Sequence, residues 1–484
     1  MSPSARRIPV WLAVVAASLP MFMSTLDNLV VTNALPAMRA DLGASIEQLQ
    51  WFVNAFTLAF ASFILVAAAL GDRLGRRTVF LVGIAVFTGG SILAALSTTP
   101  EMVIISRAIQ GLGAAGVMPL SLTLLAGSVP TRLRPAMIGI WGGVAGLGVA
   151  LGPLIGGAVV EGWNWQAIFW INVPVGVIAL PLALIALPNS RGARVRIDVL
   201  GVLLAGLGVL AVVYGIVRGN DAGWDSLEIV GSLTIGALLL IGFVLWELRA
   251  PAPLLPLRLF RDRSFTVANI VGLAFSFGMF GSVFILIQFL QVVQGASPLQ
   301  AGLQTMPWTL APMFIAPLAG FLAPRVGTRA LMVTGLTMQT IALVWMALVM
   351  SADIPYLQLV PPFLLAGVGM ALVFAPMSTA VLAHMPEVDH AKATGTNSTL
   401  REVGTALGVA ALTAVFLGAG GQLTPTGYVD AAVPAILTGA AVLGVGAIAA
   451  LFLPAGRGTT VAHDADLDRM DAETPAAEEP LPVG

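Results

Sequence analysis

Long apolar runs recur through almost the whole chain, and they constrain its fold more than any other feature. A membrane-spanning helix needs about 20 predominantly apolar residues. Hydrophobic residues make up 58% of the chain and charged residues only 10%, whereas soluble domains carry about 25% charged residues. Fourteen such runs lie near residues 10–36, 48–70, 78–98, 101–127, 135–160, 165–188, 197–217, 228–247, 265–291, 299–322, 329–350, 356–383, 395–418 and 430–453. The sequence therefore predicts an all-α membrane protein with fourteen transmembrane helices.

Basic residues fall at alternate connections between these runs. They gather near residues 6–7, 73–77, 132–134, 191–196, 249–263, 325–329 and 392, while the remaining connections hold only Arg39 and Arg218. Because Lys and Arg near span ends favour the cytoplasmic side, both termini are predicted to be cytoplasmic, which requires an even number of spans. Omitting either 197–217 or 228–247 would invert every later loop, so both are kept.

A repeated loop predicts two similar halves. Residues 71–77 (GDRLGRR) follow the second run and residues 323–329 (APRVGTR) follow the tenth, with Arg, Gly and Arg in matching places. Repeats of this kind are typical of transporters in which two halves move around a binding site near the membrane midplane, so that the site opens to each side of the membrane in turn. We expect four regions: an N-terminal six-helix bundle (8–190), two inserted helices with a cytoplasmic linker (191–263), a C-terminal six-helix bundle (264–454) and a disordered acidic tail (455–484).

Composition and motifs argue against several functions. The chain has no cysteine, and its three histidines lie in polar stretches, so we expect no metal site. A net charge of −1 gives no general attraction to nucleic acid. The sequence contains no P-loop, no cluster of catalytic side chains and no ring of like charge typical of a channel. We expect neither an enzyme nor a cofactor, and protons would serve as the coupling ion.

Asp27 is the only carboxylate well inside a run of the first half. It lies about 15 residues, or roughly 22 Å, from the inner end of its helix. A charged side chain there is costly and should face a cavity. Because burial disfavours the ionised form, this acid could bind and release protons, and a lipophilic cation could compete with the proton. The alternative is a structural acid capped by neighbouring hydroxyls and amides.

Other charged groups within the runs have two interpretations each. Arg107 shares a helix face with Gln110; it would tune a nearby acid or orient water, or else bind backbone carbonyls. Arg401 and Glu402 lie early in the span that starts near 395. They would form a local ion pair, or Glu402 would be a second proton site.

The segment from Gly139 to Gly157, GIWGGVAGLGVALGPLIGG, contains no charged residue. In lipid such a segment stays helical, and its glycines allow close approach of a neighbouring helix. Pro153 removes a backbone donor and favours a kink. The residues concerned are Gly139, Gly148, Gly152, Pro153, Gly156 and Gly157. This helix either lies at an interface along which two bundles move against each other, or it forms a static, tight crossing with its neighbour.

Four motifs resemble those of the major facilitator superfamily, in its fourteen-helix drug:proton antiporter branch. The loop at 71–77 is similar to the signature G-x-x-x-D-R-x-G-R-R, with Ala68 in place of the leading glycine. Residues 103–115 (VIISRAIQGLGAA) resemble the fourth-helix motif, and 139–157 the antiporter motif. Residues 26–36 (LDNLVVTNALP) are similar to the first-helix motif and depart from it at Leu29 and Thr32.

The resemblance implies a proton-coupled exporter of hydrophobic or cationic small molecules in a bacterial inner membrane. Its partners would be these lipophilic substrates and membrane lipid, with no nucleic acid, and it would function as a monomer. A dedicated exporter of one natural product and a proton-coupled importer are the alternatives. A conformational latch would involve Asp72, Arg73, Gly75, Arg76 and Arg77, whose arginines also fit simple membrane anchoring. Possible cavity residues are Asn28, Asn33, Trp51, Asn54, Gln110, Gln288, Gln291, Trp308 and Arg401.

Overall fold

The computed structural model describes residues 9–130, 133–191, 198–386 and 389–454. The predicted acidic tail lies outside these residues, as do parts of the linkers. The described chain is helical and contains no strand. Its helices are α1 (Val10–Leu42), α2 (Ile46–Leu74), α3 (Arg76–Ala95), α4 (Pro100–Ser128), α5 (Arg134–Gly162), α6 (Ala167–Trp170), α7 (Asn172–Ala186), α8 (Val199–Ala222), α9 (Leu227–Glu247), α10 (Arg263–Gln288), α11 (Pro298–Val326), α12 (Thr328–Val349), α13 (Tyr356–Leu382), α14 (His390–Gly418) and α15 (Pro425–Ala450). A 3-10 turn (Leu257–Arg261) precedes α10, and a π-helical turn (Phe289–Val293) follows it.

These helices supply the fourteen predicted spans. Within the described residues, twelve helical segments are long and apolar enough to cross a membrane, with α6 and α7 forming one of them. The helices α5 and α11, of 29 residues each, complete the set. The runs at 197–217 and 228–247 are the helices α8 and α9. The prediction of an all-α, fourteen-helix membrane protein is confirmed.

Local sequence explains where many helices begin and end. A side-chain oxygen caps the N-terminus of seven of the described helices by accepting a backbone N–H of the first turn. The capping residues are Ser45, Thr99, Asp198, Ser226, Asp262, Ser297 and Thr424. Gly75 separates α2 from α3 with φ 116°, and Gly327 separates α11 from α12 with φ 92°. Only glycine adopts such angles readily. The repeated loops therefore turn at equivalent glycines.

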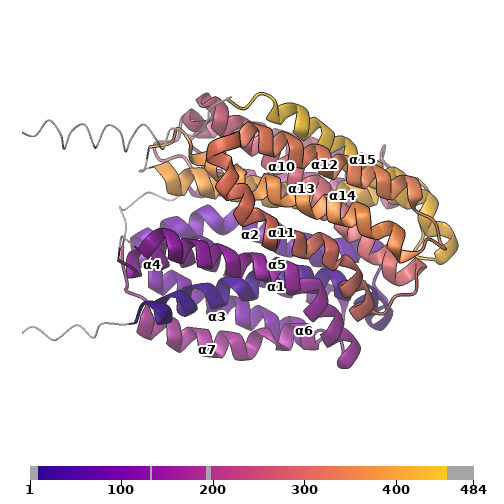
Figure 1. Ribbon diagram of the computed structural model, residues 1–484, viewed down its shortest axis with the longest axis horizontal. Coiled ribbons are helices and arrows are strands. Elements are labelled where there is room, and N and C mark those ends of the chain that lie inside the picture. The colour runs from indigo at the N-terminus through magenta and orange to yellow at the C-terminus, as the bar shows by residue number, and fades with distance from the viewer. Residues whose placement is uncertain (1–8, 131–132, 192–197, 387–388, 455–484) are drawn as a thin grey trace, which may run out of the picture.

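The helices form two six-helix bundles with two helices inserted between them in sequence (Figure 1). In the first bundle α1 packs on α5, α2 on α4 and α3 on α4; in the second α10 packs on α14, α11 on α13 and α12 on α13. The bundles meet along α2–α14 and α5–α11, and α8 packs against both α2 and α14. We call the end of the bundle that holds Val10 and Ala450 the termini end, and the opposite end the far end.

The inserted helix α9 lies at the edge of the molecule. Its buried residues are Ile229, Gly236 and Glu247, whereas large apolar side chains such as Leu238 and Ile241 are exposed. An exposed apolar face of this kind is favourable only against lipid. The packing thus matches the membrane location predicted from composition.

Candidate functional site

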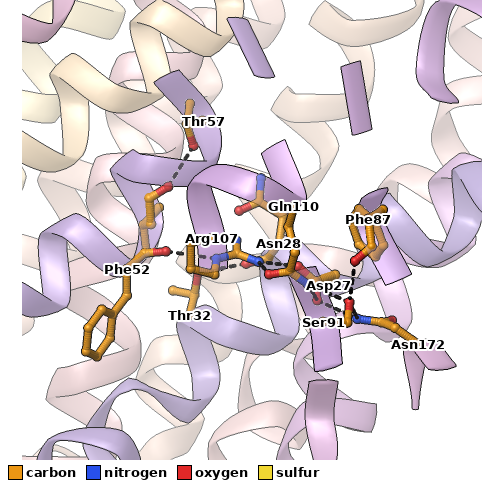
Figure 2. Close-up of polar contacts among 11 residues, drawn as sticks. Asp27, Asn28, Thr32, Phe52, Thr57, Phe87, Ser91, Arg107, Gln110 and Asn172 are labelled. Atoms are coloured by element: carbon orange, nitrogen blue, oxygen red, sulfur yellow. Dashed lines mark hydrogen bonds and ion pairs between the residues drawn. The ribbon is translucent and has the colours of Figure 1, made fainter. Parts of the chain in front are cut away.

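A buried ion pair joins Asp27 of α1 to Arg107 of α4 (Figure 2). The Arg107 Nη1 donates to Asp27 Oδ2. Asp27 is 2% exposed and Arg107 is fully buried. Asp27 lies midway along α1, and Arg107 lies about two turns from the start of α4, inside the N-terminal bundle. Desolvating one charge alone would cost several kcal/mol, so the two charges are tolerated there because each neutralises the other.

Amide and hydroxyl groups from two more helices complete the surroundings of Asp27. Asn172 Nδ2, at the start of α7, donates to Asp27 Oδ1 at 2.7 Å, and Gln110 Nε2 donates to the same oxygen at 3.3 Å. Ser91 Oγ on α3 accepts from Gln110 Nε2 at 2.7 Å and from Asn172 Nδ2 at 3.2 Å. Figure 2 shows these groups converging on the carboxylate. Asp27, together with the two amides that donate to it, therefore links four helices of one bundle.

Arg107 has contacts on several sides and one donor left over. Its Nε donates to the backbone oxygen of Phe52 at 2.9 Å, and its Nη1 also donates to Gln110 Oε1 at 2.9 Å. The guanidinium lies 4.4 Å from the ring centroid of Phe56, a favourable cation–π distance. Among the described residues its buried Nη2 has no hydrogen-bond partner. The arginine is fixed in position yet retains a free donor.

This arrangement adds residues that the sequence did not identify. Arg107 and the amides enclose the Asp27 carboxylate, which lines neither of the two cavities described below, so its predicted position beside a cavity stays a prediction. The prediction that Arg107 lies beside an acid is confirmed. Asn172 and Ser91 were missed. The available signal was the amide at position 172, which stands among apolar residues within the run 165–188.

The second bundle holds Arg401 and Glu402 in a different way. The Arg401 guanidinium lies 4.2 Å from the ring centroid of Phe374. No ion pair within 4 Å joins Arg401 to Glu402 in the part of the chain that the structure describes. The local pair expected from adjacent positions is therefore not formed, because neighbouring helical side chains project about 100° apart and Arg401 turns towards the aromatic ring.

The glycines of α5 pack against two helices. Three of them face α1, as the position of an added Cβ atom shows. A Cβ at Gly148 would lie 3.2 Å from Thr25 Cβ, and a Cβ at Gly152 would lie 2.7 Å from Leu29 Cβ. A Cβ at Gly156 would lie 3.0 Å from Val30 Cα. Gly157 faces α11 instead, where a Cβ would overlap the Pro298 oxygen and lie 2.6 Å from Leu299 Cα. Pro153 lies within the helix. The surroundings of Gly139 lie outside what the structure describes.

The close crossing of α5 and α11 is reciprocal. A Cβ at Gly302 of α11 would overlap the Pro153 oxygen of α5 and lie 3.1 Å from Leu154 Cα. Each helix thus presents a glycine to the backbone of the other. Since α5 belongs to the first bundle and α11 to the second, the antiporter-like glycine segment lies directly at the junction of the two halves.

The loop at 71–77 is bound within the first bundle. Asp72 pairs with Arg76 at 2.7 Å. Arg77 Nη1 donates to the backbone oxygens of Leu184 and Leu187 at 2.9 and 3.0 Å, near the end of α7. Arg73 is exposed. A Cβ at Gly75 would overlap the Asn189 side chain. The loop therefore ties α2 and α3 to the end of α7.

The candidate cavity residues separate into three groups. Gln288 lines a cavity of about 290 Å³ at the far end, together with Arg39 and Gly43. Trp308 lines a second cavity, of about 20 Å³, between α1, α5, α10, α11 and α13. This volume holds about one water. Asn33 and Gln291 bind each other, and Gln110 belongs to the Asp27 site. The remaining candidates, Asn28, Trp51, Asn54 and Arg401, line neither cavity.

A helical membrane protein of two similar bundles, with a buried acid–arginine pair and a glycine-lined junction, has the architecture of a secondary transporter. The family model described as Major Facilitator Superfamily matches residues 17–409. The chain belongs to this family.

Several relatives match over most of the chain. It is 35% identical to the multidrug resistance protein Stp of Mycobacterium tuberculosis, over 87% of this chain and 79% of that protein. It is 33% identical to the tetracenomycin C resistance and export protein of Streptomyces glaucescens, over 88% and 79%. It is 34% identical to the methylenomycin A resistance protein of Bacillus subtilis, over 88% and 91%. The crystal structure of an auto-inhibited POT family peptide transporter shares the fold, with a TM-score of 0.66, 16% identity and coverage of 92% of this chain and 96% of that chain.

Replacing Asn172 with Ala is expected to destabilise the protein by about 1.5–3 kcal/mol, because it removes a short hydrogen bond to a charged, buried carboxylate. Thermal unfolding of the purified protein in detergent measures this effect. The matched control is Asn189→Ala, since Asn189 makes only an exposed 3.3 Å bond to Thr78. Equal unfolding temperatures for the two variants would contradict the importance of the Asn172 contact.

Proposed function

We propose that the chain is a proton-coupled antiporter that exports hydrophobic or cationic small molecules by alternating access. The observation that carries this proposal is the Asp27–Arg107 pair, the only ion pair among the described residues in which both side chains are buried. The names of the relatives, which describe multidrug resistance or antibiotic resistance and export, support the direction of transport.

The mechanism follows from the exchange of partners at Asp27. Arginine does not release its proton, so a proton that binds at this pair would be carried by Asp27. A proton on Asp27 would cancel one charge and free the Arg107 guanidinium, which already has an idle Nη2. A cationic substrate would favour the ionised acid instead. Competition between proton and cation for one carboxylate then couples their movements in opposite directions.

The proposal extends to location and partners. The termini end would face the cytoplasm of a bacterium, as the distribution of arginines predicts. The chain would work as a monomer in the lipid bilayer, and its substrates would be small lipophilic molecules. Glu402 would be a second proton-binding group. The 71–77 loop, with its Asp72–Arg76 pair, would act as a conformational latch at the cytoplasmic end. We propose no cofactor, no catalytic activity and no nucleic-acid partner.

A dedicated exporter of one natural product is the second candidate. It is favoured by relatives that are named for single antibiotics, tetracenomycin C and methylenomycin A. The two candidates differ in the range of compounds transported. A proton-coupled importer is the third, and it would move its substrate with the proton rather than against it.

Transport into inverted membrane vesicles tests the function. With an imposed gradient, acid inside, we expect uptake of a monocationic dye such as ethidium, and we expect a protonophore to abolish it. Vesicles without the protein provide the background. Uptake that is indifferent to the protonophore would contradict proton coupling, and proton-driven loss of dye from the vesicles would indicate an importer. A panel of unrelated dyes separates multidrug export from dedicated export.

A further inference from the structure

Asn33 connects three helices and the π-helical turn across the junction of the two bundles. Its Nδ2 donates to the backbone oxygen of Pro153 on α5 at 2.8 Å and to that of Pro298 on α11 at 3.0 Å. Gln291, in the turn after α10, donates its Nε2 to both the Asn33 backbone oxygen and Asn33 Oδ1 at 2.8 Å. Asn33 is fully buried. It therefore binds elements of both halves at once.

Glu161 makes a second connection between the halves. It lies at the last turn of α5, and its Oε2 accepts from Ser297 Oγ at 2.5 Å and from the backbone N–H of Leu299 at 3.2 Å. Ser297 is the N-cap residue of α11. A carboxylate at a helix N-terminus is stabilised by the unpaired N–H groups and by the helix dipole. Glu161 of the first bundle thus caps a helix of the second.

Both connections lie at the far end, next to the α5–α11 crossing. The reciprocal packing of Gly157 and Gly302 brings the backbone oxygens of Pro298 and Pro153 together, which is why one amide group can reach both. Pro153 also lines the small cavity, together with Val283 and Trp308. Separation of α5 from α11 at this crossing, next to the cavity, would break both connections.

We propose that Asn33 and Glu161 are positioning residues that hold the far end closed, and that Asn33 transmits the state of Asp27 to this closure. The second part rests on the proposed antiport function. Asn33 and Asp27 lie on one helix, six residues or about 9 Å apart. The prolines inside α1, at positions 20 and 36, flank this interval rather than interrupt it. A shift of α1 on release of Arg107 would therefore move Asn33 relative to α5 and α11.

Cysteine labelling tests the closure without requiring transport. The chain contains no cysteine, so Val283→Cys provides a single reporter in the small cavity. Right-side-out vesicles are treated with a membrane-impermeant maleimide from the far side. Glu161→Ala is expected to raise the labelling rate on the order of three- to fivefold, and Asn33→Ala by at least about tenfold because it loses several buried hydrogen bonds. Glu161→Gln keeps an acceptor oxygen and should have a smaller effect.

The matched control is Glu101→Ala. Glu101 is also an exposed acid at the far end, but its hydrogen bond, from Gln48 at 2.8 Å, remains within the first bundle. Its removal should leave labelling unchanged. Unchanged rates in both Glu161→Ala and Asn33→Ala would overturn the proposal, and so would an equal increase in Glu101→Ala, which would indicate general loosening.

A second comparison tests the link to Asp27. The variant Asp27→Asn imitates the protonated acid and is expected to change the labelling rate by at least about threefold when Asn33 is present. In the Asn33→Ala background the same substitution should have no further effect, because coupled residues act non-additively. An unaltered effect of Asp27→Asn in that background would overturn the link. Proton-independent dye uptake together with altered labelling would overturn the proposed antiport and leave the closure standing.

Discussion

Replacing Asp27 with Asn is expected to abolish proton-driven dye uptake, down to the level of vesicles that lack the protein. The amide cannot exchange a proton near neutral pH, and it leaves the buried Arg107 without its counter-charge. Breaking a buried pair in this way costs about 3–5 kcal/mol of stability. Uptake must therefore be measured together with the amount and unfolding temperature of the protein.

The double variant Asp27→Asn with Arg107→Gln separates a structural role from a role in coupling. It removes both charges, and replacing both members of a buried pair is often nearly neutral for stability. We expect it to regain stability relative to Asp27→Asn and to remain inactive in proton-driven uptake. If the double variant regained proton-driven uptake as well, the pair would serve only to hold α1 and α4 together.

Replacing Gly157 with Ala is expected to have the second largest effect. The added Cβ would overlap the Pro298 oxygen and lie 2.6 Å from Leu299 Cα, and backbone atoms cannot rotate aside as a side chain can. Overpacking of this kind costs typically about 1–3 kcal/mol. Because the clash falls at the crossing of the two bundles, we also expect transport to fall by roughly tenfold.

Gly162→Ala is the matched control for Gly157→Ala. Gly162 lies on the same helix, five residues later, and a Cβ there would meet nothing within 4 Å. The comparison therefore holds the residue change and the helix constant and varies only the neighbour. Equal transport rates for the two variants would show that the close crossing is unimportant for function.

Much of the fold could be predicted from the sequence because a membrane imposes a simple rule on each span. An apolar run of sufficient length becomes a helix regardless of what packs against it, so 197–217 and 228–247 could be assigned before any contact was known. The repeat could be recognised because Arg, Gly and Arg occupy matching places in residues 71–77 and 323–329. In the structure its glycines, Gly75 and Gly327, both have positive φ. The packing partners of the α5 glycines could not be assigned, since spacing alone does not say which helix lies opposite.

The site could be predicted only in part. Asp27 and Arg107 were identifiable as rare charges in apolar runs, but their direct contact depends on how α1 and α4 pack. The roles of Asn172 and Asn33 depend on partners 145 and 120 positions away along the chain. Asn33 was a candidate cavity residue, and in the structure it binds Gln291 and two backbone oxygens. Such long-range pairings leave no local pattern in a single sequence.

Proton release on addition of substrate tests the central claim most directly. Purified protein in weakly buffered detergent solution is mixed with a monocationic substrate, and the pH of the solution is followed. If proton and cation compete for Asp27, the wild-type protein releases protons and the double variant Asp27→Asn with Arg107→Gln releases none. Equal proton release from both proteins, at equal substrate binding, would contradict the assignment of Asp27 as the shared site.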